Sequence, residues 1–108
     1  MTKSFEVLWT VVAEKDLLGI VRFIADDDPR AALGVLRKIK SGTAKLDHSP
    51  MRGRAVPALL RHGISRYREI VVKPWRGIYR IDKQNVYVVA VIDGRRNVED
   101  LLLTRLLE

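Results

Sequence analysis

The chain has 108 residues, of which 47% are hydrophobic and 31% are charged. This length suits one domain over residues 1–108, and the composition is typical of a globular protein rather than a disordered one. No apolar run approaches the ~20 residues that a membrane-spanning helix needs, so no membrane contact is expected. Cysteine is absent and only His48 and His62 are present, which excludes a disulfide framework and argues against a metal site. No cofactor is expected, and the first ten residues lack the long apolar core of a signal peptide, so a cytoplasmic location is expected.

The positive charge is unevenly distributed along the chain. The net charge is +7, but residues 1–50 carry 8 Lys/Arg against 7 Asp/Glu, whereas residues 51–96 carry 11 against 3. Residues 97–108 are slightly acidic. A concentrated positive field favours a polyanion or an acidic protein surface as partner.

The first half of the chain predicts a strand followed by a helical hairpin. Lys3 to Trp9 has the composition of a strand, and Thr10 can cap an amphipathic helix over residues 11–26. Asp28-Pro29 is a favourable helix start, and apolar residues recur at spacings of three and four over residues 29–47. The short link between the two helices predicts that they pack antiparallel.

The second half predicts three strands and a last helix. Residues 48–64 contain two prolines and two glycines and are expected to be irregular. The strands are predicted over Arg66–Val72, Trp75–Ile81 and Asn85–Ile92, joined by turns at Lys73-Pro74 and Asp82-Lys83-Gln84. The last strand is apolar on both alternating faces, so we expect it to be central and covered on both sides.

Asn97 and Asp100 predict the start of a C-terminal helix that is rich in leucine up to Leu107. The predicted fold class is therefore α+β, a single domain with an N-terminal strand, an antiparallel helical hairpin, a three-stranded antiparallel meander and a C-terminal helix. We expect the helices to lie on one face of the sheet.

Arginines on neighbouring strands form the first candidate site. Arg68 and Arg80 lie among Tyr67, Tyr79 and Trp75, and guanidinium groups side by side favour an anion between them. The aromatic residues could stack on a base or simply fill the core. The arginines could equally bridge Glu69 and Asp82. Because the hairpin register is not fixed by the sequence, the face that each arginine occupies stays open.

A second candidate site follows the last strand, at Gly94-Arg95-Arg96. Gly94 suggests a tight turn with positive φ, and the two arginines would then lie near the start of the last helix, where an anion is favoured. RNA cleavage would need a proton acceptor and a proton donor besides positive charge. No histidine falls on the strands, Glu69 is expected to be ion-paired, and Tyr79 or Lys73 could serve only with a strongly displaced pKa.

The order and spacing of several short motifs resemble the RelE/ParE toxin superfamily. In the helical half these are Trp9-Thr10, Ala13-Glu14, Asp16-Leu17, Ile24-Ala25 and the Asp28-Pro29 helix start; in the second half they are Pro50, Gly53-Arg54, residues 67–72, Tyr79-Arg80-Ile81, residues 86–92 and Gly94-Arg95-Arg96. The resemblance spans nearly the whole chain. It implies the same fold and a toxin role in a type II, plasmid-stabilisation-type toxin–antitoxin system.

The resemblance also implies partners. A cognate antitoxin would cover the hairpin or add to the sheet, and operator DNA would be bound only through the antitoxin. The antitoxin-binding residues are expected on the hairpin and the last helix: Leu17, Val21, Leu36, Leu102 and Leu106. RelE-like members cut mRNA on the ribosome with basic residues and a C-terminal aromatic, whereas ParE-like members inhibit DNA gyrase and lack that set.

The absence of a Tyr or His after Tyr87 favours the ParE-like branch, with no catalytic residues. The target-binding residues are then expected to be the two arginine sets and one aromatic: Arg95, Arg96, Arg68, Arg80 and Trp75. A ribosome-dependent endoribonuclease using Arg68, Arg80 and Tyr79, and a non-toxic antitoxin-binding module, are the alternatives. The family commonly has His where this chain has Asp93, and a carboxylate there lowers the positive potential of the corner.

Overall fold

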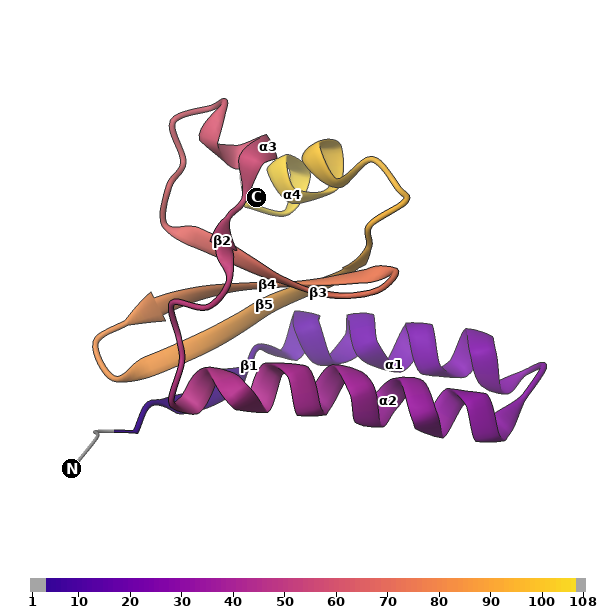
Figure 1. Cartoon of the computed structure of the whole chain (residues 1–108). Coiled ribbons are helices and arrows are strands. Elements are labelled where there is room, and N and C mark those ends of the chain that lie inside the picture. The colour runs from indigo at the N-terminus through magenta and orange to yellow at the C-terminus, as the bar shows by residue number, and fades with distance from the viewer. Residues whose placement is uncertain (1–3, 107–108) are drawn as a thin grey trace.

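The structure is a computed structural model that describes residues 4–106. It consists of a five-stranded sheet with helices on both faces (Figure 1). In chain order the elements are β1 (Glu6–Trp9), α1 (Val11–Ala25), α2 (Pro29–Ala44), the 3-10 turn η1 (Lys45–Asp47), β2 (Arg54–Ala55), α3 (Pro57–Leu60), β3 (Tyr67–Val72), β4 (Trp75–Asp82), β5 (Asn85–Asp93) and α4 (Val98–Leu106). The predicted α+β class and helical hairpin are confirmed. Of the predicted first strand, Lys3 lies outside the described residues, as does Leu107 of the last helix.

The helix starts follow the capping residues that the sequence predicts. The Thr10 hydroxyl accepts a hydrogen bond from the Ala13 amide, and the Asp28 carboxylate accepts from the amides of Arg30 and Ala31. At α4 the side chain of Asn97 accepts from the amide of Asp100. These bonds satisfy amide groups that the first turn of a helix leaves without partners.

The sheet has the strand order β1-β5-β4-β3-β2. β1 runs parallel to β5, and every other pair is antiparallel. The middle strand is therefore β4, and the expectation that the last strand would be central is wrong in that detail. β5 is nevertheless an interior strand covered on both faces, as its apolar pattern predicts. In the chain, the helical hairpin and the three strands β2, β3 and β4 lie between β1 and the parallel β5.

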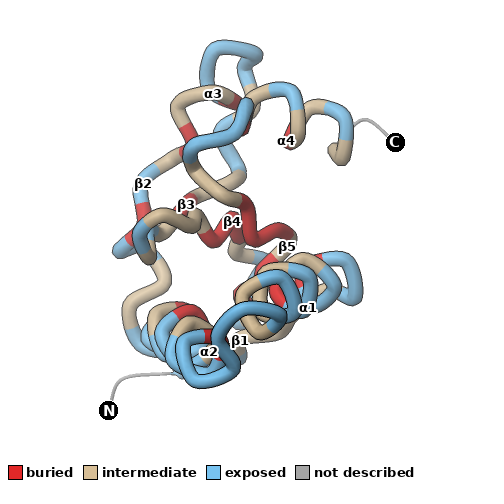
Figure 2. Tube along the Cα trace, turned by 90° about the vertical axis from the view of Figure 1, so that its right-hand side faces the viewer, coloured by how far each residue is buried: buried red, intermediate tan, exposed pale blue. Residues whose placement is uncertain are grey.

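The helices cover two faces, not one, so that expectation is wrong. The hairpin α1–α2 packs on one face, while α3 and α4 pack on the other (Figures 1 and 2). Ala90 and Ile92 of β5 contact the core under α3 and α4, whereas Val88 and Val91 contact the core under the hairpin. A strand that is apolar on both sides needs a cover on each, and the leucine-rich α4 supplies the second.

A β-bulge in β5 sets which residues face each layer. Ile78 of β4 pairs with Ala90 and the next residue, Tyr79, pairs with Val88, so Val89 has no partner on β4. The extra residue shifts the alternation along β5 by one position. This shift lets Val88 and Val91 share the hairpin face although their spacing is three residues.

The segment 48–64 is more ordered than its composition predicts. It forms the short strand β2 and the helical turn α3. β2 pairs with β3 and adds a fifth strand at the edge of the sheet. Gly53 lies so close to its neighbours that a Cβ atom there would be 2.5 Å from the Glu69 carbonyl oxygen and from the Tyr79 hydroxyl. The glycine is therefore a packing requirement that local sequence rules do not reveal.

No helix within residues 4–106 is long and apolar enough to cross a membrane.

Candidate functional site

The register of β3 and β4 separates the two arginines that the sequence placed together. Arg68 pairs with Tyr79, and Arg80 pairs with Tyr67. Directly paired residues share a face of the sheet, and Tyr79 faces the hairpin side, so Arg68 and Arg80 point to opposite faces. The expectation that these two guanidinium groups could hold one anion is therefore wrong.

Each of the two arginines has contacts of its own. Arg68 donates a hydrogen bond to the Gly53 carbonyl at 2.6 Å. Arg80 lies 4.4 Å from the centre of the Tyr87 ring and 3.9 Å from the Asp82 carboxylate. Arg80 thus bridges to Asp82 as one interpretation of the sequence suggested, whereas Arg68 does not bridge to Glu69.

Tyr79 is fully buried and its hydroxyl is already used twice. It donates to the Pro50 carbonyl at 2.7 Å and accepts from the Gly53 amide at 3.0 Å. Burial raises the pKa of Tyr79 above its usual value, and the hydrogen bond from Gly53 and the charges of Arg68 and Arg52 only partly oppose that. A phenol in this state is a structural tie between the loop and the sheet.

Glu69 is buried on the opposite face of β3, between two arginines. Its carboxylate accepts a hydrogen bond from Arg54 Nε at 2.8 Å and lies 3.6 Å from Arg76 Nη1. Among the described residues, its Oε1 atom has no hydrogen-bond donor. The prediction that Glu69 is ion-paired is confirmed, but its partners are Arg54 of β2, a strand that was not predicted, and Arg76 of β4, and not Arg68.

The second candidate site forms a corner at the other end of the sheet. Trp75 pairs with Asp93, and Asp93 holds Arg95 through hydrogen bonds at 2.9 and 2.7 Å. The side-chain hydrogen bond from Arg95, together with its amide, lowers the pKa of Asp93 to about 2. Of the two arginines expected to form a cationic pair, Arg95 is therefore neutralised by Asp93, while Arg96 is exposed.

Gly94 does not have the positive φ that the sequence suggested. A Cβ atom at this position would lie 2.9 Å from Arg76 Nε and 3.0 Å from the Pro74 carbonyl oxygen. The Gly94 amide donates to that carbonyl at 2.8 Å. A glycine is needed here because two chain segments approach closely, not because of the backbone angle.

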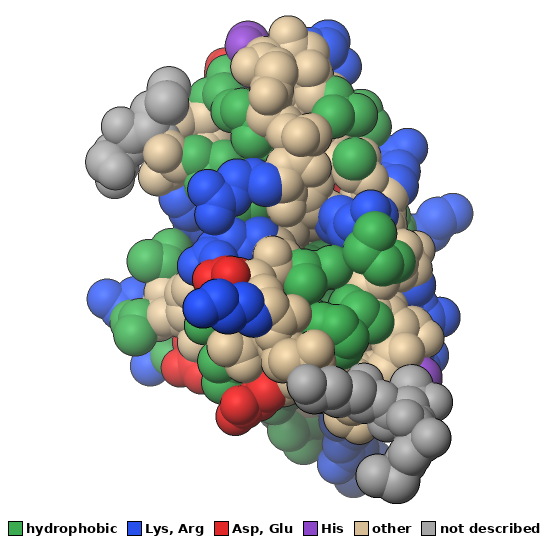
Figure 3. All heavy atoms as spheres, turned by 90° about the vertical axis from the view of Figure 1, so that its left-hand side faces the viewer, with side chains coloured by type: hydrophobic (Ala, Val, Ile, Leu, Met, Phe, Trp, Pro, Cys, Tyr) green, Lys and Arg blue, Asp and Glu red, His purple; other side chains and the backbone are tan. Residues whose placement is uncertain are grey.

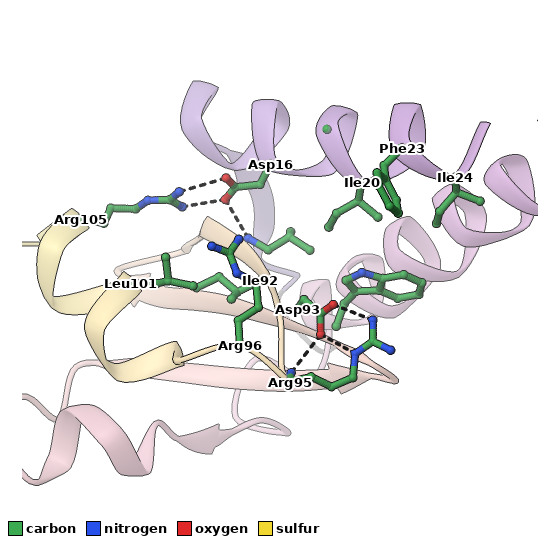
Figure 4. A pocket seen from close by; sticks show the side chains of 13 residues that line it. Asp16, Ile20, Phe23, Ile24, Ile92, Asp93, Arg95, Arg96, Leu101 and Arg105 are labelled. Carbon is green, nitrogen blue, oxygen red and sulfur yellow. Dashed lines mark hydrogen bonds and ion pairs between the residues drawn. The ribbon is translucent and has the colours of Figure 1, made fainter. Parts of the chain in front are cut away.

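This corner borders a groove between α1, the end of β5 and α4 (Figure 4). We call it the α1–α4 groove; it encloses about 550 Å³. It is lined by apolar side chains with arginines at its rim: Asp16, Gly19, Ile20, Phe23, Ile24, Trp75, Val91, Ile92, Asp93, Arg95, Arg96, Leu101 and Arg105. Phe23 is 82% exposed, so the groove presents an aromatic ring to solvent.

An ion pair closes one end of the α1–α4 groove. Arg105 of α4 donates to both carboxylate oxygens of Asp16 in α1, at 2.6 and 3.0 Å. Asp16 also accepts from the Val91 amide at 3.0 Å, next to the bulge (Figure 4). The contact joins helices from opposite faces of the sheet. Because Asp16 and Arg105 are 89 positions apart in the chain, local sequence patterns could not predict it.

Two of the residues expected to bind an antitoxin are internal. Leu17 is 4% exposed in the hairpin core, and Leu102 of α4 is fully buried between that helix and the sheet, so neither can contact a partner in this structure. The correction has a simple cause, since periodic apolar residues mark the face that the chain itself buries. Val21, Leu36 and Leu106 are partly buried at the edges of the same cores and stay predictions.

Basic side chains are spread widely over the end of the molecule at the β4–β5 turn, and acidic ones are few there (Figure 3). A second groove, between α2 and β3, is also basic. Within residues 4–106, no group of three or more His, Asp or Glu side chains is placed to hold a metal ion.

This architecture defines a small α+β protein with two surface grooves, one between α1 and α4 and one between α2 and β3. Comparison with known proteins supplies the family. Residues 7–98 match the model of the ParE toxin of the type II toxin–antitoxin system parDE. Toxin ParE3 from Caulobacter vibrioides is 30% identical over 93 residues, which cover 85% of this chain and 89% of that protein. The chain therefore belongs to the ParE toxin family.

Two solved structures share the fold. One, from a chromosomal ParDE toxin–antitoxin system of P. aeruginosa, has a TM-score of 0.68 at 17% identity, covering 82% of this chain and 95% of that chain. The other, from the toxin–antitoxin complex RelBE2 of Mycobacterium tuberculosis, has a TM-score of 0.59 at 21% identity, covering 86% and 94%. The RelE/ParE-like fold that the motifs implied is confirmed.

Proposed function

We propose that this toxin acts in the cytoplasm by inhibiting DNA gyrase and is neutralised by a cognate antitoxin. The observation that carries the proposal is the separation of the groups that a nuclease would need. Arg68 and Arg80 lie on opposite faces of the sheet, and the hydroxyl of Tyr79 is buried and bonded on both sides. Cleavage of RNA needs a proton acceptor, a proton donor and a cation around one phosphate. A toxin that inhibits gyrase by binding to it needs only an interaction surface and no groups for proton transfer.

The α1–α4 groove supports an antitoxin partner. The structural neighbours are a ParDE system and a RelBE2 toxin–antitoxin complex, and we infer a corresponding partner for this chain. Ile20, Phe23 and Leu101 offer apolar walls, and Arg96 stands exposed at the rim. A segment with apolar side chains on one side and carboxylates on the other would match this groove in shape and charge.

The same groove includes three of the five residues predicted to contact the target; Arg68 and Arg80 lie outside it. Arg96 and Trp75 line it together with Arg95, so an antitoxin seated there would cover the corner and prevent contact with gyrase. Because Asp93 holds Arg95, Arg96 is the cation that we expect to contribute more. Arg96→Ala should reduce toxicity more than Arg95→Ala, measured as colony formation after induction at matched protein levels. Unchanged toxicity in both variants would remove the corner from the mechanism, and equal losses would show that the pairing of Arg95 with Asp93 does not lower its contribution.

Asp93 favours one alternative, a chain that binds its antitoxin but has lost toxicity. The carboxylate of Asp93 neutralises Arg95. The family resemblance implies His at position 93. On this alternative Asp93→His should restore growth inhibition, whereas a gyrase inhibitor would already be toxic with Asp93 in place.

Induction of the chain in a bacterium separates the hypotheses. We expect filamentous cells with DNA-damage signalling, and inhibition of supercoiling when the purified protein is added to gyrase. Rapid translation arrest with mRNA cleavage would instead establish the ribosome-dependent nuclease. Absence of any growth effect would support the antitoxin-binding module. Co-expression of the product of the adjacent short gene should remove the growth defect if that product is the antitoxin.

A further inference from the structure

A second groove, which the proposed function does not use, runs between the hairpin and the outer part of the sheet. We call it the α2–β3 groove; it encloses about 610 Å³ and its floor is formed by residues 70–72 of β3. Five cations line it: Arg37 and Lys38 from α2, Lys45 at the C-terminal end of that helix, Arg52 from the loop before β2, and Lys73 from the β3–β4 turn. Of the residues that line it, none is acidic.

The helical spacing explains why one wall is a row of charge. Lys38, Ser41 and Lys45 follow one another at intervals of three and four, which places them on one side of α2 and its C-terminal cap, beside Arg37. From Lys38 to Lys45 the row extends roughly 10 Å, at a rise of about 1.5 Å per residue. Arg52 and Lys73 stand on the other side of the groove.

A glycine brings the two walls together. A Cβ atom on Gly42 would lie 3.0 Å from the Cγ2 atom of Val72 and 3.8 Å from the Cδ1 atom of Ile70. Because Gly42 has no side chain, α2 lies close against β3, and the cations on α2 approach those of the loop and the turn.

The charges in this groove are not compensated. Within residues 4–106, no ion pair joins any of the five cations to a carboxylate. The α1–α4 groove differs, because Arg95 and Arg105 there are paired with Asp93 and Asp16. Like charges at such spacing repel each other, and an anion between them relieves that repulsion.

We propose that the α2–β3 groove binds the phosphodiester backbone of duplex DNA without sequence preference. Two rows of cations on either side of a groove match a regularly charged chain, and Lys acts as a point charge toward phosphate. The lining has no aromatic side chain on which a base could stack and no Asn or Gln to recognise base edges. Five cations, unpaired among the described residues, make the charge of the lining its dominant feature, and the lining offers no exposed aromatic ring comparable to Phe23 of the α1–α4 groove as an anchor for a protein segment. The toxin would then contact DNA directly, and not only through its antitoxin as the family resemblance implied.

Fluorescence anisotropy with a labelled duplex of about 20 base pairs and arbitrary sequence tests the proposal. The test variant replaces three groove cations, Arg37→Gln, Lys38→Gln and Lys45→Gln. The matched control replaces three exposed helical cations outside the groove, Lys15→Gln, Arg22→Gln and Arg30→Gln. Both variants lose the same net charge, so a difference between them reports position rather than total charge.

We expect the test variant to bind the duplex at least ~10-fold more weakly at 100 mM salt. The slope of log K against log [salt] should become shallower by about 2.7, which is about 0.9 for each phosphate that the variant no longer neutralises. The control should stay within about 2-fold of the parent protein. Urea unfolding midpoints of all three proteins should agree, because the substituted side chains are exposed.

Three results would overturn the proposal. The first is an equal loss of affinity in both variants, which would show that only total charge matters. The second is no binding of the duplex by the parent protein at 50 mM salt. The third is competition by poly-glutamate as strong, per charge, as by unlabelled duplex, which would make the groove a site for acidic protein segments. None of these results bears on gyrase inhibition, which is measured by supercoiling.

Discussion

The two grooves of this protein differ in how their charges are balanced. In the α1–α4 groove, Asp93 and Asp16 each hold an arginine, and the surface between them is apolar with Phe23 exposed. In the α2–β3 groove, five cations stand without a carboxylate partner among the described residues. An apolar surface with compensated charge suits a partner that buries side chains, whereas uncompensated charge suits a polyanion. Net charge alone, +7 for the whole chain, does not distinguish these two situations.

The largest effect is expected where α4 forms a wall of the α1–α4 groove. Leu102 is fully buried between α4 and the sheet, so Leu102→Ala should lower the free energy of unfolding by about 2–5 kcal/mol, through reduced burial and the cavity left behind. Leu103→Ala, at a partly buried position of the same helix, should cost clearly less. Urea unfolding measures both. Similar losses for the two variants would contradict the observed docking of α4.

The ion pair at the end of the same groove should have the next largest effect. Asp16→Ala leaves Arg105 and the Val91 amide without their carboxylate and should cost roughly 2 kcal/mol, less than a fully buried pair because both side chains are partly exposed. Glu14→Ala on the exposed side of α1 is the control, expected within about 0.5 kcal/mol of the parent. If the two variants unfold alike in urea, the bridge between α1 and α4 contributes nothing to stability.

The apolar character of the α1–α4 groove can be tested at its exposed ring. Phe23→Ser should weaken antitoxin binding by about 10-fold, a loss of about 1.4 kcal/mol, with little change in stability because the ring is 82% exposed. Leu33→Ser, at a residue of α2 that is 50% exposed and outside this groove, is the matched control. Calorimetric titration with the antitoxin gives both affinities. Equal weakening would place the antitoxin across the hairpin surface rather than in the groove.

The smallest effect is expected on the stability of the folded protein at low pH. Because Arg95 lowers the pKa of Asp93 to about 2, from 3.8, the pair contributes stability above about pH 4 and that contribution is lost as the pH falls toward 2. NMR titration of the Asp93 carboxyl group should show the midpoint near 2. Asp93→Asn should remove this part of the acid dependence. A midpoint near 3.8 would mean that Arg95 is not held in solution, and the two grooves would then be more alike in charge than the structure indicates.

Much of this protein could be predicted from local sequence. Thr10, Asp28 and Asn97 mark the starts of α1, α2 and α4 correctly, because a capping side chain bonds to amides only two or three residues away. Residues 86–92 were predicted to be covered on both sides, which is a property of their apolar pattern alone. The family resemblance rested on the order of such motifs, and the comparisons confirm it.

The candidate sites depend on contacts between distant segments. Whether Arg68 and Arg80 share a face is decided by pairing between strands, and a shift of one residue would have reversed the answer. The bulge at Val89, the partnership of Asp16 with Arg105, and the approach of α2 to β3 at Gly42 involve residues far apart in the chain. Sequence by itself determined the total charge, the helices α1, α2 and α4 and the strands β1, β3, β4 and β5, because those follow from neighbours along the chain. Only tertiary structure decided which charges are paired and which stand free, because that requires the strands to be in register and the helices to be docked.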